Sequence, residues 1–250
     1  MYRLTATRPD IAYAIGVFSR YNHNPSNEHM VALKRVFRYL NGTKNWRLHF
    51  GRALGGALEG ERALGCYVDS DYAGCPDDYK LTSGLVITFG GAVDWRSRKQ
   101  KPTTQSTTDA EYYAFRVRCM RLTQISHLLN ELGIPTIPQV FSNSQPLITR
   151  IKNRIYCGTA VAHIATKYNL AADMARDGEI DLSFLPTTEM VADCFTKPLP
   201  KSAFLKQCAA MGMIGIGLGN GLGIGIGNGV GNGHGNGIGT ENGIGNGVGM

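Results

Sequence analysis

The amino-acid sequence predicts an α/β domain, in which a mixed β-sheet carries helices on its faces. Three short segments at residues 64–69, 85–89 and 93–97 have the apolar, β-branched and aromatic content of strands. A long amphipathic segment follows them, and shorter strand and helix patterns alternate after it. This order, three strands followed by alternating helices and strands, is typical of a mixed sheet covered by helices.

Local signals support each of these elements. Gly90 and Gly91 separate the second and third strands, and a glycine pair between two strand patterns predicts a hairpin turn. A helix is expected over residues 108–132, ended by Gly133 and Pro135, with an apolar face formed by Phe115, Cys119, Leu122, Ile125, Leu129 and Leu132. Further strands are expected at residues 139–142 and 181–185, and further helices at residues 159–176 and 188–195.

Composition divides the chain into three zones. Residues 1–50 contain an amphipathic helix at 27–41, with Ser26 as its N-cap and Gly42 as its stop signal. Residues 64–204 have the mixed composition of a globular domain. Residues 215–250 alternate glycine with single aliphatic residues and asparagine, and such a segment is expected to be disordered because it buries too little to offset its ordering entropy.

The overall composition predicts an intracellular protein with an acidic partner. The formal net charge of +7 and the pI of about 9.1 favour nucleic acid first. No secretory signal pattern or transmembrane run is present, so the cytoplasm or nucleus is expected and a membrane partner is not. The six cysteines are scattered through apolar segments, as free buried thiols are in a reducing compartment. The composition leaves the oligomeric state open.

Two acidic stretches are candidates for chemistry. In CYVDSDYAG, Asp69 and Asp71 lie two residues apart and therefore face the same way on a strand. In STTDAEYYA, Glu111 lies three residues after Thr108. Each stretch also has a purely structural explanation, namely a polar turn after a strand for the aspartates and a capping box for Glu111. These residues alone therefore do not establish a metal site.

The order of several short motifs is more specific. TATRPDIAYAIGVFSRYNHNPSNEHMVALKRVFRYLNGT, YVDSDYAG, DDYKLTSGLVITFGG, VDWRSRKQK, STTDAEYYA, ELG and VADCFTKPL follow one another between residues 1 and 204. In this order they resemble the C-terminal part of the Pol polyproteins of Ty1/copia-type retrotransposons. Residues 1–50 resemble the end of the reverse transcriptase, and residues 64–204 resemble its ribonuclease H domain.

The resemblance implies a ribonuclease H-like fold with a five-stranded mixed sheet, helices on both faces and an N-terminal helical remnant. It also implies hydrolysis of the RNA strand of an RNA–DNA hybrid by two Mg²⁺ ions held between carboxylates. Asp69, Glu111 and Asp193 match the family's metal ligands. Asn143 occupies the fourth catalytic position, where the family carries aspartate.

Asn143 predicts impaired catalysis, because an amide offers one neutral carbonyl oxygen in place of a charged carboxylate. Ala165 and Asn169 also depart from the family pattern. Weak Mg²⁺ binding is expected, with Mn²⁺ as an alternative ion. The sequence leaves open whether the chain is an impaired hydrolase, a nucleic-acid-binding module without activity, or an inert transposon fragment.

A basic run follows the third predicted strand and contains Arg96, Arg98, Lys99 and Lys101. The resemblance implies that these residues contact nucleic-acid phosphates. Alternatively, the basic residues have a structural role, because positive charge on an exposed edge strand disfavours pairing with the strands of other chains.

Overall fold

The computed structural model describes residues 6–51, 63–71, 82–99, 107–153 and 171–215. Its centre is a five-stranded sheet formed by β2 (Leu64–Asp71), β3 (Thr82–Phe89), β4 (Ala92–Lys99), β5 (Gln139–Ser142) and β6 (Asp181–Phe184). The strand order is β4-β3-β2-β5-β6. Strands β2, β3 and β4 are antiparallel neighbours, whereas β5 is parallel to both β2 and β6. The predicted mixed sheet is therefore confirmed, with β2 at its centre.

The tight turn between β3 and β4 is formed as the sequence predicts. Gly90 has a φ of +67°, a conformation that glycine adopts without steric cost. The backbone N–H of Phe89 donates to the carbonyl oxygen of Gly91 across this turn, at 2.8 Å. The glycine pair therefore reverses the chain at the point that the sequence indicates.

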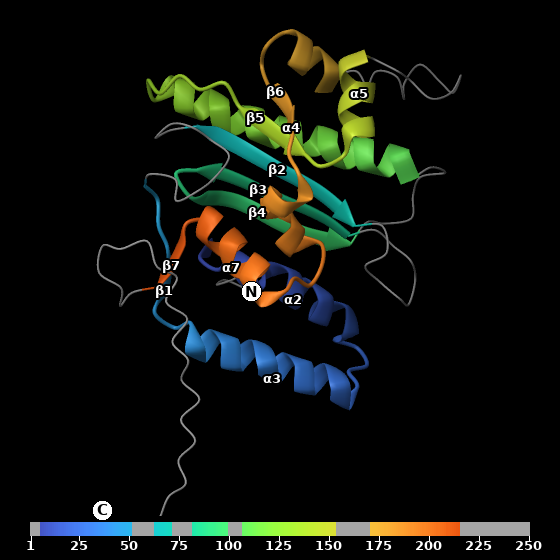
Figure 1. Cartoon of the computed structure of the whole chain (residues 1–250), viewed down its shortest axis with the longest axis vertical. Coiled ribbons are helices and arrows are strands. Elements are labelled where there is room, and N and C mark those ends of the chain that lie inside the picture. Colours follow the sequence, from blue (N-terminus) through green and yellow to red (C-terminus); the bar gives the residue numbers. More distant parts are fainter. Residues whose placement is uncertain (1–5, 52–62, 72–81, 100–106, 154–170, 216–250) are drawn as a thin grey trace, which may run out of the picture. The chain divides into compact units, whose positions relative to one another are not determined.

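Helices cover both faces of the sheet (Figure 1). One face carries α4 (Thr107–Glu131), α5 (Gln145–Asn153) and the helical residues 171–176. The other carries α2 (Ala12–Phe18), the 3-10 helix η4 (Val191–Phe195) and α7 (Lys201–Ala210). Alternation along β2 divides its side chains between two cores: Cys66 and Val68 pack with α4, and Tyr67 packs on the opposite side against Phe141.

The N-terminal residues pack against the same sheet. After α2, the 3-10 helix η2 (Ser19–Tyr21) leads to α3 (Asn27–Gly42), whose N-cap Ser26 shares a capping box with His29. The short strand β1 (Trp46–Leu48) then pairs in antiparallel fashion with β7 (Met213–Gly215), near the other end of the described chain. The described residues, 6–51, 63–71, 82–99, 107–153 and 171–215, belong to one compact unit. The domain limits predicted at residues 50, 64 and 204 stay predictions, and the glycine-rich tail lies outside the described residues.

Several element boundaries differ from the sequence prediction. Helix α3 continues through Gly42 and is capped by Thr43. The helix expected at 188–195 consists of two 3-10 helices, η3 (Thr187–Glu189) and η4. The helix expected at 159–176 is described only from residue 171. Helices α2, α5 and α7, the 3-10 helix η1 (Pro9–Ile11) and strands β1 and β7 were not predicted, because such short segments depend on tertiary packing rather than on a clear local period.

Among the described residues, no helix combines the length and the apolar character that crossing a bilayer requires.

Candidate catalytic site

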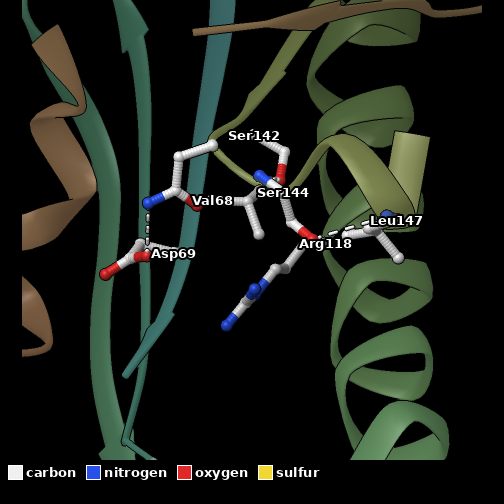
Figure 2. Close-up of a pocket in the computed structure, with 7 residues that line it drawn as sticks. Val68, Asp69, Arg118, Ser142, Ser144 and Leu147 are labelled. Atoms are coloured by element: carbon white, nitrogen blue, oxygen red, sulfur yellow. Dashed lines mark hydrogen bonds between the residues drawn. The ribbon is translucent and has the colours of Figure 1, made fainter. Parts of the chain in front are cut away.

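The site begins at the neighbouring ends of β2 and β5. The two strands are parallel, and Val68 is paired in register with Ser142. Asp69 follows Val68, and Asn143 follows Ser142 directly after β5. The parallel pairing therefore brings the side chains of Asp69 and Asn143 together. Asn143 Nδ2 donates to Asp69 Oδ1 at 3.0 Å (Figure 2). The predicted fourth position is thus adjacent to the first aspartate, with its amide donor facing the carboxylate.

A second element reaches Asp69 from the opposite core. Thr196, directly after η4, places its hydroxyl 2.5 Å from Asp69 Oδ2 and 3.1 Å from the carbonyl oxygen of Asp193. The hydroxyl has a single proton, and the shorter separation assigns it to Asp69. Both oxygens of this buried carboxylate therefore accept a hydrogen bond from a neutral side chain.

Asp193 belongs to the same cluster. It lies in η4, where its buried carboxylate pairs with Lys197 Nζ at 2.8 Å through Oδ2. Burial raises the pKa of Asp193 to about 6; Lys197 opposes the rise and the negative charge of Asp69 adds to it. The two carboxyl groups form a mutual hydrogen bond only when one of them holds a proton, since two carboxylates have no donor. The Asp69–Asp193 pair therefore favours a cation or a proton between its members.

The structure thus brings three of the four predicted site residues together: Asp69, Asn143 and Asp193. Glu111 lies within α4, but its side chain is outside the described part of the structure. The same holds for the side chain of Asp71 at the end of β2. The role of each predicted residue stays a prediction.

A cavity of about 40 Å³ opens beside Asp69, and its lining includes Val68, Asp69, Arg118, Ser142, Asn143, Ser144 and Leu147. Figure 2 shows the Arg118 side chain reaching from α4 towards the strand that carries Asp69. This side chain is buried, with 6% of the residue exposed. The residues that line the cavity therefore include one basic and one acidic residue.

Three polar residues of the site were missed from the sequence. Thr196 and Lys197 lie in the VADCFTKPL motif but have no acidic side chain to draw attention to them. Arg118 is a cation among the apolar positions Phe115, Cys119 and Leu122 of α4. A charge on the buried face of an amphipathic helix is a signal for a polar site, because burying a charge is costly unless a partner compensates it.

The described residues offer two carboxylates that a cation could contact, those of Asp69 and Asp193. Oδ1 of Asp193 is buried and has no hydrogen-bond partner within the described part of the chain, as expected of an oxygen available to a cation. Asp69 supplies the second carboxylate. Across the described ranges, no group of three histidine, cysteine, aspartate or glutamate side chains is close enough to hold a metal. Asn143 as oriented presents a donor rather than an acceptor to Asp69.

The predicted basic run is divided between the two faces of the edge strand β4. Arg96 is paired with Leu85, which packs in the core under α4, so Arg96 and Arg98 lie on the α4 side of the sheet. Both arginines are exposed. Lys99 points to the other face, and Lys101 lies outside the described residues. Of the four predicted phosphate contacts, Arg96 and Arg98 therefore share one exposed face, and the roles of Lys99 and Lys101 stay predictions.

The sheet order, the strand directions and the helices on both faces form the ribonuclease H-like fold that the sequence predicts. Among solved structures, the chain is similar to LC11-RNase H1 isolated from compost, with 19% identity, a TM-score of 0.40 and coverage of 58% of this chain and 97% of that one. No family model matches the chain.

The curated relatives are mostly transposon polyproteins. The Retrovirus-related Pol polyprotein from transposon TNT 1-94 of Nicotiana tabacum is 37% identical over 206 residues, which cover 82% of this chain and 15% of the polyprotein. The Transposon Ty1-LR3 Gag-Pol polyprotein of Saccharomyces cerevisiae is 24% identical over 198 residues, covering 79% of this chain and 11% of that protein.

A shorter match reaches higher identity. Secreted RxLR effector protein 161 of Plasmopara viticola is 43% identical over 115 residues, which cover 46% of this chain and 77% of that protein. That match spans under half of the chain, whereas the match to the Nicotiana tabacum transposon spans most of it. The chain corresponds to only 15% of the length of that polyprotein. With its collinear motifs and its fold, the chain belongs to the Pol polyproteins of Ty1/copia-type retrotransposons.

Proposed function

We propose that the chain is a ribonuclease H-like domain that binds RNA–DNA hybrid and hydrolyses it poorly, because its metal site is incomplete. The observation that carries this proposal is the hydrogen bond from Asn143 Nδ2 to Asp69 Oδ1. An amide that donates to a ligand carboxylate occupies one of its oxygens and adds no negative charge. When bound, Mg²⁺ would activate water and stabilise the leaving oxygen.

The chain's own residues have distinct roles in this proposal. Asp69 and Asp193 would hold the ion, with Glu111 as the third carboxylate that the family pattern predicts. Lys197 neutralises Asp193 at 2.8 Å, and Thr196 orients Asp69 through its short hydrogen bond. These two side chains hold the carboxylates in place but reduce the negative charge available to a cation. Weak metal affinity follows from this competition.

Hybrid binding would depend on the exposed arginines of β4. Arg96 and Arg98 lie on the same side of the edge strand and are open to solvent. A phosphate backbone is recognised by such cations without sequence preference. The second candidate function, nucleic-acid binding without any cleavage, is favoured by the same Asn143 contact. Cleavage of a labelled hybrid distinguishes the two functions.

Replacing Asn143 with aspartate is expected to make the free energy of unfolding depend on Mg²⁺. In EDTA, the free energy of unfolding should fall by about 1–2 kcal/mol, because a donor to buried Asp69 is lost and a like charge is introduced. Saturating Mg²⁺, at about 100 times the dissociation constant, should restore about 2.7 kcal/mol by binding the folded state. Denaturation at a series of Mg²⁺ concentrations measures both effects.

The control for this substitution is Asn45→Asp, which adds the same charge in an exposed turn before β1. Cleavage of a labelled hybrid is measured alongside, with Mg²⁺ and with Mn²⁺. Negligible cleavage by the wild type and measurable cleavage by Asn143→Asp support an impaired hydrolase. Hybrid binding with no cleavage by either protein favours the binding module. Rapid cleavage by the wild type would show that the site is complete as it stands.

Replacing Arg96 and Arg98 together with glutamine is expected to weaken hybrid binding and to reduce its salt dependence. The logarithm of the binding constant falls linearly with the logarithm of the salt concentration. Each lost phosphate contact should make this slope less steep by about 0.9, the value for a B-form duplex. Fluorescence anisotropy with a labelled hybrid in EDTA measures the slope without metal. The double variant Lys34→Gln/Arg35→Gln removes the same charge from exposed positions of α3. A slope unchanged in the β4 variant would contradict this surface.

A further inference from the structure

We propose that Lys197 is an exchangeable cation of the site, which pairs with Asp193 in the absence of metal and with a nucleic-acid phosphate when a divalent ion binds Asp193. Ion binding and hybrid binding then strengthen each other. The inference rests on the proposed function, because it concerns the same carboxylate and the same ligands. It adds a contact between Lys197 and the hybrid, and a coupling between the two binding events.

The backbone places Lys197 one helical turn after Asp193. The backbone N–H of Lys197 donates to the carbonyl oxygen of Asp193 at 3.1 Å, and Lys197 Nζ lies 2.8 Å from Asp193 Oδ2. Residues four apart in a helical turn have their side chains on the same side. Thr196, the residue before Lys197, donates its hydroxyl to Asp69 instead. Two consecutive residues therefore contact one carboxylate each.

Burial distinguishes these two contacts. Thr196 is 0% exposed, so its hydrogen bond to Asp69 is enclosed by protein. The Lys197 side chain is 32% exposed, whereas the Asp193 side chain is only 3% exposed. An ion pair that water can reach contributes little to stability, and lysine carries its charge on a flexible four-carbon stem. Lys197 can therefore change its partner far more readily than Thr196.

The second oxygen of Asp193 provides a route for an incoming ion. Asp193 Oδ1 is buried and has no hydrogen-bond partner within the described ranges. A cation can therefore contact Oδ1 while Lys197 still holds Oδ2. Two positive charges on one carboxylate repel each other, and burial of that carboxylate leaves the repulsion poorly screened. Binding of the ion thus weakens the Lys197–Asp193 pair.

A phosphate of the hybrid is the partner that Lys197 then gains. Lysine binds phosphate as a point charge, without the fork geometry that arginine uses. A phosphate that approaches Asp193 is within reach of Lys197, because Nζ already lies 2.8 Å from that carboxylate. Without a divalent ion, the negative charge of the carboxylates opposes this approach. Each ligand therefore improves the affinity for the other, and the coupling is reciprocal.

The test measures both ligands with the full chain. Mn²⁺ binding without nucleic acid, followed by electron paramagnetic resonance, should be about tenfold tighter in Lys197→Met than in the wild type, the equivalent of one hydrogen bond to a charged group. Hybrid binding is followed by fluorescence anisotropy at constant ionic strength. Mg²⁺ should raise the hybrid affinity of the wild type about tenfold, as is usual for coupled sites, and most of this increase should be lost in Lys197→Met.

The matched control is Lys206→Met, which removes the same charge from an exposed position of α7. Lys206 Nζ contacts the carbonyl oxygen of Thr188 at 3.4 Å and no carboxylate is involved in that contact. This variant should behave like the wild type in both measurements. Lys197→Arg keeps the charge and should lie closer to the wild type than Lys197→Met does. Should Lys197→Met fail to fold, Lys197→Gln provides the same comparison.

Two results would overturn the proposal: equal Mn²⁺ affinities in the Lys197→Met and Lys206→Met variants, or an equal effect of Mg²⁺ on hybrid binding by the wild type and Lys197→Met. Absence of hybrid binding by the wild type would instead contradict the proposed function. In that case the Mn²⁺ comparison, which uses no nucleic acid, still decides whether Lys197 opposes the ion at Asp193. A denaturing gel of the same samples shows whether the hybrid stays intact.

Discussion

Replacing Asp10 with asparagine is expected to lower the free energy of unfolding by about 3–5 kcal/mol, because the substitution leaves the buried guanidinium of Arg8 without its charged partner. Arg8 Nη2 lies 2.7 Å from Asp10 Oδ2, and Arg8 Nε lies 2.9 Å from Asp10 Oδ1. The side chains are 6% and 0% exposed, so water cannot replace the lost partner. Chemical denaturation monitored by circular dichroism measures the loss.

This ion pair joins three parts of the N-terminal region. Tyr39 of α3 donates its hydroxyl to Asp10 Oδ2 at 2.6 Å, and Arg8 Nη2 donates to Thr43 Oγ1 at 2.7 Å. Burial, with the charge of Asp10 next, holds the pKa of Tyr39 well above its usual value, so the phenol remains a donor. The substitution should therefore loosen α3 together with the 3-10 helix that precedes α2.

The matched control is Asp177→Asn, because Asp177 pairs with Arg176 at 2.6 Å on the surface. Exposed ion pairs contribute little, so this variant should unfold like the wild type. An equally small effect of Asp10→Asn would show that the N-terminal residues do not contribute to the stability of the sheet. Hydrogen exchange locates the loss, since amides of α3 should lose protection in Asp10→Asn alone.

Replacing Gly84 with alanine is expected to destabilise the protein by about 3 kcal/mol, the upper part of the range for overpacked sites. A Cβ atom on Gly84 would lie 2.7 Å from the carbonyl oxygen of Ala192 and 2.8 Å from Thr196 Cγ2. Because the nearest of these atoms is backbone, η4 has to move. A glycine in a strand interior often marks such a close approach.

The displacement should reach the candidate site, because η4 carries Asp193 and is followed directly by Thr196. The Thr196–Asp69 hydrogen bond should lengthen or break, and Mg²⁺ or Mn²⁺ affinity should change with it. Gly42→Ala is the control, since a Cβ at Gly42 meets no atom within 4 Å. Equilibrium denaturation of both variants checks the prediction. A Gly84 variant as stable as the Gly42 variant would mean that β3 and η4 are not held at this distance.

The sequence alone determined the parts that depend on local periodicity and on ordered motifs. The strands β2 to β6 and the helix α4 follow from short apolar runs, the glycine pair and the apolar face of residues 115–132. The proximity of Asp69 and Asn143 was also predictable, since the resemblance implies a fold in which the ends of their strands meet. Each of these features is encoded by residues close together in the chain or by a motif read in order.

Only the tertiary structure decided which polar groups surround the carboxylates. Thr196 is 127 residues from Asp69 in the sequence, and the contact exists because η4 packs against β2 and β3. The pairing of β1 with β7 and the position of Arg118 at the cavity likewise join distant segments. No local pattern specifies such contacts. They form because buried polar groups are nearly always hydrogen-bonded, and the packing of the helices and strands determines which partners lie close enough.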